Sequence, residues 1–187
     1  MTYVQQVHDY AAGLDWVSGL IEATSADALG KPTPCSEWDV RLLIGHLIGT
    51  AHRSRGTATG ISTSEVPHVV TDVPDDKLAV TYAQLVAEIV PALAALDGNM
   101  SVQAPWGQVT ALEAVRGFTV ETVAHGWDLA VATDRPAIAP PGVAERCLAL
   151  AVDVIPSRLR GVMYSDPVAD DPDLSPTERL AHLLGHH

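Results

Sequence analysis

The sequence has little positive charge. Its 187 residues contain 11 Lys and Arg against 23 Asp and Glu, which gives a formal net charge of -12. Proteins that bind nucleic acids or anionic membrane surfaces need clustered basic residues to contact phosphates. We therefore expect neither a nucleic-acid partner nor a membrane partner.

Cysteine, leader-like segments and common enzyme motifs are also scarce or absent. The two cysteines, Cys35 and Cys147, are too few for a disulfide framework and lack the spacing of a thiolate metal site. The N-terminal sequence MTYVQQVHDY does not resemble a signal peptide, and no apolar run approaches the roughly 18 residues of a membrane span. GxSxG, P-loop, GxGxxG and HExxH motifs are missing. These absences predict a reduced, cytoplasmic protein.

Aromatic residues make up only 5% of a chain that is 47% hydrophobic, so its core must rest on Ala, Val and Leu. This composition favours helices, and the length fits one domain spanning residues 1–187. Helical periodicity or capping signals occur in six segments, at about residues 3–24, 39–53, 75–98, 110–133, 143–160 and 175–185. With almost no strand signal, the sequence predicts an all-α four-helix bundle with additional short helices.

Individual residues predict where these helices begin, bend and end. Thr2, Asp39 and Ser175 suit N-caps, Thr110 and Glu113 have the spacing of a capping box, Pro91 should kink the third helix and Gly98 should end it. A bend near Pro156 is expected in the fifth helix, and residues 56–74 should form a long loop. Gly45 and Gly49 would allow a neighbouring backbone to approach the second helix.

Two helices carry polar residues that could form one site. His46 lies on a helix that is apolar almost all round, whereas Glu121 and His125 lie four residues apart on one face of another helix. Taken alone, His46 also fits a neutral core histidine, and the Glu121–His125 pair fits a contact on a solvated face. Together, the three form the ligand set of a catalytic zinc site with an open fourth position.

The ligand types favour zinc and would also accept nickel, iron or manganese. Asp128, three residues after His125, could orient that ring or remain at the helix rim. We assign no catalytic residue from the sequence.

Other polar and aromatic residues have less specific interpretations. Cys35 could be a nucleophile or a small buried turn residue, and Cys147 belongs to the core. Trp38 and Trp106 are expected to close the ends of the bundle. His8, His68 and His182 are scattered, His52 lies on another face from His46, and Arg53 and Arg55 could meet an anionic substrate or thiol. His186 and His187 could be native or the remainder of a purification tag.

The segments TPCSEWDVRLLIGHLIG and ETVAHGWDLAVATDRP resemble the N-terminal domain of mycothiol-dependent maleylpyruvate isomerase. More broadly, they are similar to the DinB-like, thiol-dependent S-transferase superfamily of metal-binding four-helix bundles. Single-domain actinobacterial members carry a similar Pro-Cys-x-x-Trp turn and a later His-x-Trp-Asp-Leu-Ala stretch. The resemblance covers roughly residues 5–185 and implies that His46, Glu121 and His125 occupy the family's metal-ligand positions. The isomerase has an additional C-terminal domain, for which 187 residues leave no room.

The resemblance implies a metal-dependent enzyme that uses a low-molecular-weight thiol, mycothiol, in transfer to or isomerisation of a small electrophile. Its partners would be that thiol and the electrophilic substrate. A coordinated water could instead make the protein a metal-dependent hydrolase. The alternative from another class is a non-catalytic metal- or small-ligand-binding bundle, which could form a homodimer, and a metal-free structural domain is also compatible with the sequence.

Overall fold

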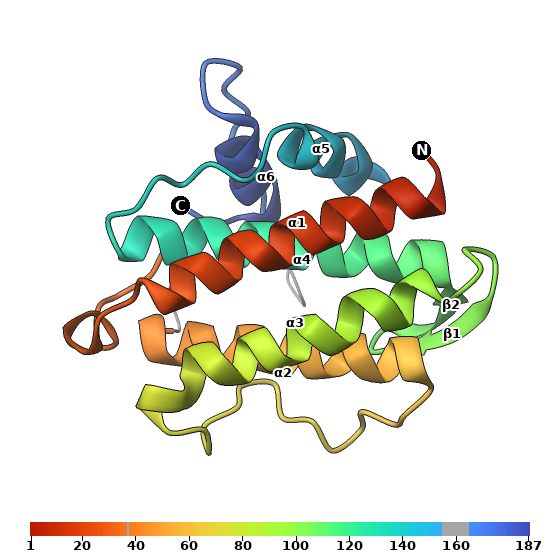
Figure 1. The fold of residues 1–187 in the computed structure, drawn as a ribbon. Coiled ribbons are helices and arrows are strands. Elements are labelled where there is room, and N and C mark those ends of the chain that lie inside the picture. Colours follow the sequence, from red (N-terminus) through yellow and green to blue (C-terminus); the bar gives the residue numbers. More distant parts are fainter. Residues whose placement is uncertain (37, 155–164) are drawn as a thin grey trace.

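The computed structural model describes residues 1–36, 38–154 and 165–187, and these residues are mainly helical (Figure 1). The α-helices are α1 (Tyr3–Glu22), α2 (Val40–Thr59), α3 (Leu78–Ala94), α4 (Ala111–Ala132), α5 (Val143–Val154) and α6 (Pro176–Leu184). Short 3-10 helices, η1 (Ala26–Ala28) and η2 (Asp75–Lys77), precede α2 and α3. Within this described part, the sheet consists of strands β1 (Ser101–Ala104) and β2 (Gly107–Thr110). The predicted all-α fold is confirmed.

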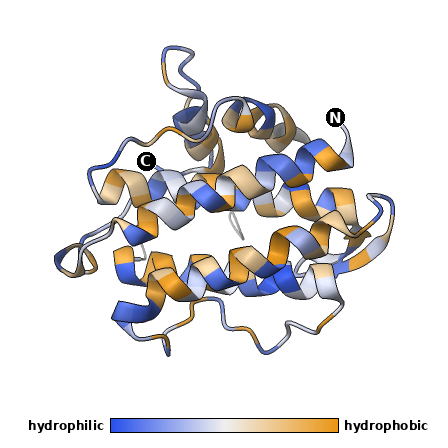
Figure 2. Cartoon of the chain, viewed as in Figure 1, coloured by the Kyte–Doolittle hydropathy of each residue, from blue (hydrophilic) through white to orange (hydrophobic). Residues whose placement is uncertain are grey.

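Helices α1 to α4 pack together as a bundle, in which α1 contacts α3 and α4, and α2 also contacts α3 and α4 (Figure 1). Figure 2 shows that apolar and polar residues are interspersed along each helix. The apolar faces bury a shared core that includes Tyr10, Leu14, Ile44, Ile89 and Phe118. Burial of this continuous apolar surface is the main source of the bundle's stability.

Helices α5 and α6 form a second layer against α4 (Figure 1). Val123, Cys147 and Leu180 belong to the apolar cluster between them. Burial raises the pKa of the Cys147 thiol to about 12, which agrees with the core position expected for this residue. Arg146 of α5 also donates to both carboxylate oxygens of Asp9 on α1, at 2.6 and 2.7 Å. This fork fixes the second layer to the bundle.

The predicted N-terminal caps are confirmed. Thr2, Asp39, Thr110 and Ser175 each accept a hydrogen bond from a backbone N–H in the first turn, and Thr110 forms the full capping box with Glu113. These side chains satisfy donors that have no partner within the helix. The starts of α1, α2, α4 and α6 are thus set by local sequence.

Other boundaries differ from the predictions. Helix α2 continues to Thr59, so the following loop begins at Gly60 rather than at residue 56. Helix α3 ends at Ala94, three residues after Pro91 and before Gly98. The predicted extension of the fifth helix and its bend at Pro156 lie outside the described residues.

A β-hairpin was not expected. Antiparallel strands β1 and β2 pair from Ser101 opposite Thr110 to Ala104 opposite Gly107. The Thr57 side chain donates to the Gln103 carbonyl oxygen at 3.0 Å, which ties the hairpin to α2. Strands of only four residues are too short for a clear alternating pattern, so tertiary contacts decide their pairing.

The segment of residues 60–74 runs along α2, below it in Figure 1. A Cβ atom on Gly45 would collide with the Val70 carbonyl oxygen, and one on Gly49 would come within 3.0 Å of the Pro67 carbonyl oxygen. The Val70 N–H also donates to the Gly45 carbonyl oxygen at 3.1 Å. The prediction that these two glycines admit a neighbouring backbone is confirmed.

Among the described residues, Asp75–Ala94 has the length and composition of a membrane span, with a mean hydropathy of 1.3. The expectation that no stretch approaches this length was therefore wrong. A core helix of a soluble protein meets the same criteria, so they are weak evidence on their own. Tyr82, Leu85 and Ile89 of this segment are buried in the bundle core.

Candidate metal centre

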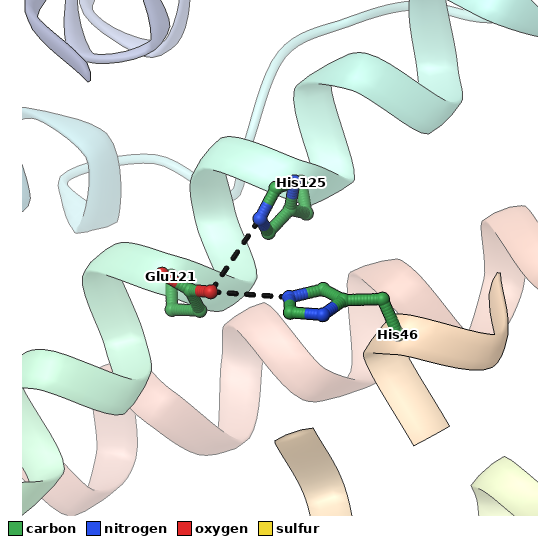
Figure 3. A group of neighbouring side chains, drawn as sticks. All are labelled: His46, Glu121 and His125. Carbon is green, nitrogen blue, oxygen red and sulfur yellow. Dashed lines mark hydrogen bonds and ion pairs between the residues drawn. The ribbon is translucent and has the colours of Figure 1, made fainter. Parts of the chain in front are cut away.

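His46, Glu121 and His125 converge between α2 and α4 (Figure 3). His46 Nε2 lies 3.1 Å from Glu121 Oε1, and His125 Nε2 lies 3.5 Å from the same oxygen. Both imidazoles are buried, whereas the Glu121 side chain is 28% exposed. The structure therefore brings together the three residues singled out in the sequence, and Glu121 connects them to solvent.

The tautomer of His46 follows from its second contact. Its Nδ1 lies 3.2 Å from the His68 carbonyl oxygen, which can only accept, so Nδ1–H is the donor. In neutral His46, the unprotonated Nε2 then faces the Glu121 carboxylate, and both atoms offer lone pairs. A cation between them would satisfy both.

His125 is oriented by a buried carboxylate. Its Nδ1–H donates to Asp128 Oδ2 at 2.9 Å, and Asp128 has no exposed surface. Of the two alternatives for Asp128, the structure shows contact with the ring rather than a place at the helix rim. A carboxylate in this position fixes the ring and turns Nε2 towards Glu121.

Asp128 has a second imidazole partner, His186, whose Nδ1–H donates to Oδ1 and Oδ2 at 2.9 and 2.8 Å. His186 follows α6, so the C-terminal segment of the chain reaches the candidate centre. No role at the site was predicted for His186, which could be native or the remainder of a purification tag. Its separation of 58 residues from Asp128 gives no local signal for this contact.

The charges of these groups support one another. Burial raises the pKa of Glu121, but its interactions with His125 and His46 outweigh burial and hold that pKa well below its usual value. Burial lowers the pKa of His125, yet Asp128 and Glu121 together raise it to about 10. Burial lowers the pKa of His46 despite the opposing effect of Glu121. Near neutral pH, the ion-free site therefore holds a Glu121 carboxylate and a protonated His125.

Trp38 and Thr50 surround the two ligand-type imidazoles. The Trp38 ring lies 4.5 Å from the His46 ring and 5.6 Å from the His125 ring, measured between centroids. Trp38 therefore packs on the candidate centre, and the expectation that it closes an end of the bundle was wrong. Thr50, one turn after His46, places its hydroxyl oxygen 3.4 Å from His46 Nε2. That i,i+4 spacing was visible in the sequence and was missed.

Trp106 and Cys35 complete the turn residues that the sequence singled out. The Trp106 ring, in the turn of the hairpin, lies 5.0 Å from the Phe118 ring between centroids and packs over Gly117 of α4. Cys35 is partly exposed in the turn before α2, rather than buried as one interpretation expected.

The other histidines divide into near and distant ones. The His68 ring lies 4.7 Å from the His46 ring, so this residue belongs to the surroundings of the site. The His182 ring contacts Trp127 instead, at 6.1 Å. His52 is half-buried and lies near Arg55 and Glu88, as expected for a residue on another face of α2.

The ligand atoms of the three side chains lie within 4.8 Å of one another, a spacing that could hold a metal ion. A tetrahedral zinc ion with bonds of about 2.0 to 2.1 Å holds its ligand atoms about 3.3 Å apart. The separations of 3.1 and 3.5 Å at Glu121 fall on either side of that value. His125, Asp128 and His186 form a second group of the same kind, in which the Nδ1 atoms of both imidazoles face the Asp128 carboxylate.

Comparisons with known proteins agree on one family. A family model described as the mycothiol maleylpyruvate isomerase N-terminal domain matches residues 10–130. Uncharacterised proteins from two strains of Mycobacterium tuberculosis are each 31% identical over 178 residues, covering 91% of this chain and 92% of the relative.

Solved structures show the same helical fold. The crystal structure of the mycothiol-dependent maleylpyruvate isomerase has a TM-score of 0.62 at 19% identity, over 81% of this chain and 70% of that one. A mutant of that enzyme gives the same TM-score of 0.62 at 16% identity. At these identities, the likeness concerns the fold alone.

Proposed function

Because the chain belongs to the mycothiol maleylpyruvate isomerase N-terminal domain family, we propose that it is a metal-dependent enzyme that uses mycothiol on a small electrophile. The reaction would be thiol transfer or isomerisation. The observation that supports this proposal is the convergence of His46, Glu121 and His125, with one carboxylate oxygen facing two imidazole nitrogens. A cytoplasmic location stays a prediction from the sequence.

The residues of the chain have distinct parts in this proposal. A bound zinc ion would supply an open position that favours the thiolate form of a thiol, which is the reactive nucleophile. His46, Glu121 and His125 would hold the ion. The His68 carbonyl oxygen fixes the His46 ring at its Nδ1, and the Asp128 carboxylate fixes the His125 ring at its Nδ1. Trp38 covers the imidazoles and limits access of water from its side. The thiol proton would leave to solvent and the sulfur would form a bond to the electrophilic carbon. In transfer, the leaving group departs with the electron pair of its broken bond. In isomerisation, the carbon–carbon π bond opens to an enolate, and expulsion of the thiolate forms that bond again.

Thiol consumption tests the transfer reaction, and substrate conversion without net loss of thiol tests the isomerisation. Zinc-loaded protein is incubated with mycothiol and with maleylpyruvate or chlorodinitrobenzene, and free thiol and substrate are followed over time. We expect turnover that needs both protein and metal and that disappears in Glu121→Gln. Stoichiometric metal binding without turnover of any thiol and electrophile pair would favour a non-catalytic binding module and contradict the proposal.

Metal uptake should depend on pH. Because the pKa of His125 is raised to about 10 in the ion-free site, an incoming ion must displace its proton. His46 and Glu121 need lose none near neutral pH, since the pKa of each is lowered. We expect zinc affinity to rise about tenfold per pH unit between about pH 7 and 9, with about one proton released per ion. Chelator competition and proton release in weak buffer measure both, and a pH-independent affinity would contradict the assignment.

Asp128→Asn tests the support of His125. An amide can accept from Nδ1–H only through its oxygen, and it removes the charge that favours the bound orientation. We expect zinc affinity to fall by about 10- to 100-fold with little change in secondary structure. Asp134→Asn, at an exposed residue beyond the end of α4, is the matched control and should leave affinity unchanged.

A further inference from the structure

Arg53 lies on the same face of α2 as His46 and Thr50, because the three residues are spaced by four and then three positions. Its Nη2 donates to Thr50 Oγ1 at 3.4 Å, and the same oxygen lies 3.4 Å from His46 Nε2. The guanidinium and the candidate metal-binding nitrogen therefore flank one hydroxyl group. A small molecule at the centre would meet both.

The charge of Arg53 has no carboxylate partner among the described residues. Within residues 1–36, 38–154 and 165–187, no Asp or Glu oxygen lies within ion-pair distance of it. Six other basic side chains do pair with carboxylates, namely Lys31, Arg41, Arg55, Lys77, Arg146 and Arg179. Among the described residues, Arg116 and Arg135 also have no carboxylate within ion-pair distance. Arg53 is half-buried, and burial lowers its pKa although Glu121 acts in the opposite direction. Partial desolvation of a cation that has no ion-pair partner among the described residues is costly.

The known contacts of Arg53 do not use its donors fully. Nη1 donates to the Pro67 carbonyl oxygen at 2.8 Å, and Nη2 makes the long contact with Thr50. A guanidinium has five N–H donors in a planar fork, so three have no acceptor in the part of the chain that the structure describes. If a divalent ion is bound, the carboxylates of Glu121 and Asp128 would offset the two positive charges of the ion. The positive charge of Arg53 would then be available to bind an anionic ligand.

We propose that Arg53 recognises a carboxylate on the electrophilic substrate, and that the enzyme therefore prefers anionic to neutral substrates. The inference rests on the proposed function, whose site it extends. The planar fork matches the two oxygens of a carboxylate better than a single sulfur atom. We therefore assign the group that Arg53 binds to the electrophilic substrate, whereas the sulfur of the thiol would bind at the metal ion.

Binding of an inert dicarboxylate tests the inference without any turnover. Zinc-loaded protein is titrated by calorimetry with succinate and with its neutral analogue succinamide. Wild type should bind succinate more tightly than succinamide. Arg53→Gln should lower succinate affinity by roughly tenfold to a hundredfold and leave succinamide unchanged, because charge-assisted hydrogen bonds are lost.

Two further variants keep the result interpretable. Arg55→Gln removes a charge two residues away that pairs with Glu88, and it should bind succinate as wild type does. Arg53→Lys retains the charge and a donor for Pro67 but lacks the fork, so it should lose part of the affinity even if Arg53→Gln folds poorly. Wild-type affinity for succinate in either Arg53 variant would overturn the inference, as would equal binding of succinate and succinamide by wild type.

The succinate titration and the turnover assay test the two proposals separately. A succinate preference that depends on Arg53, in a protein without thiol turnover, would contradict the proposed function alone. Turnover without such a preference would contradict the role of Arg53 alone.

Discussion

Glu121→Gln is expected to lower zinc affinity by at least about a hundredfold, more than the loss of an outer carboxylate would. Glu121 Oε1 is the atom that both imidazoles face, at 3.1 and 3.5 Å, so its replacement by an amide removes the charged centre of the site. His46→Ala should have an effect of the same size. Metal content after dialysis and chelator competition measure the affinity.

The matched control is His52→Ala, which removes an imidazole from another face of the same helix and should leave metal content unchanged. Circular dichroism of all variants verifies that the helices are intact. Wild type purified without a tag should retain bound transition metal. Less than about a tenth of an equivalent, after growth in metal-replete medium, would contradict the assignment of these ligands.

Gly45→Ala is expected to lower the free energy of unfolding by about 1 to 3 kcal/mol, because the added methyl group meets the backbone of the segment beside α2. A backbone carbonyl cannot swing away as a flexible side chain can, so residues 67–70 must shift. The His68 carbonyl oxygen, which accepts from His46 Nδ1, would move with them. Zinc affinity should therefore fall together with stability.

Gly19→Ala provides the comparison for this substitution. Gly19 lies inside α1, where an added Cβ would meet nothing within 4 Å. Alanine should raise the free energy of unfolding there by about 0.5 to 1 kcal/mol through helix propensity. Urea denaturation of metal-free protein measures both variants. Equal effects of the two substitutions would show that the approach of residues 67–70 to α2 contributes little.

Local sequence predicted the helices well because their starts depend on nearby groups. The capping box at Thr110 and Glu113 and the caps at Thr2 and Asp39 involve residues at most three positions apart. Family membership was also visible in two short segments, and the comparisons confirm it. Hairpin strands β1 and β2 were missed because their pairing depends on packing against the bundle.

The candidate centre was only partly predictable. Glu121 and His125 share a helical face, and His46 stood out on an apolar helix, so the three could be singled out by pattern. Asp128, three residues after His125, could also be singled out as its ring partner. His68 and His186 could not, because they act through contacts at long separation. The His68 contact uses a backbone oxygen, which any residue could provide. Such contacts leave no specific residue type in the sequence.

The contact between His186 and Asp128 has a practical consequence for work on this protein. A polyhistidine tag added after His187 would place extra imidazoles beside the carboxylate that orients His125. Those imidazoles could bind the ion themselves, and metal content would then reflect the tag as well as the chain. A removable N-terminal tag avoids this competition, so measured stoichiometries would report on His46, Glu121 and His125 alone.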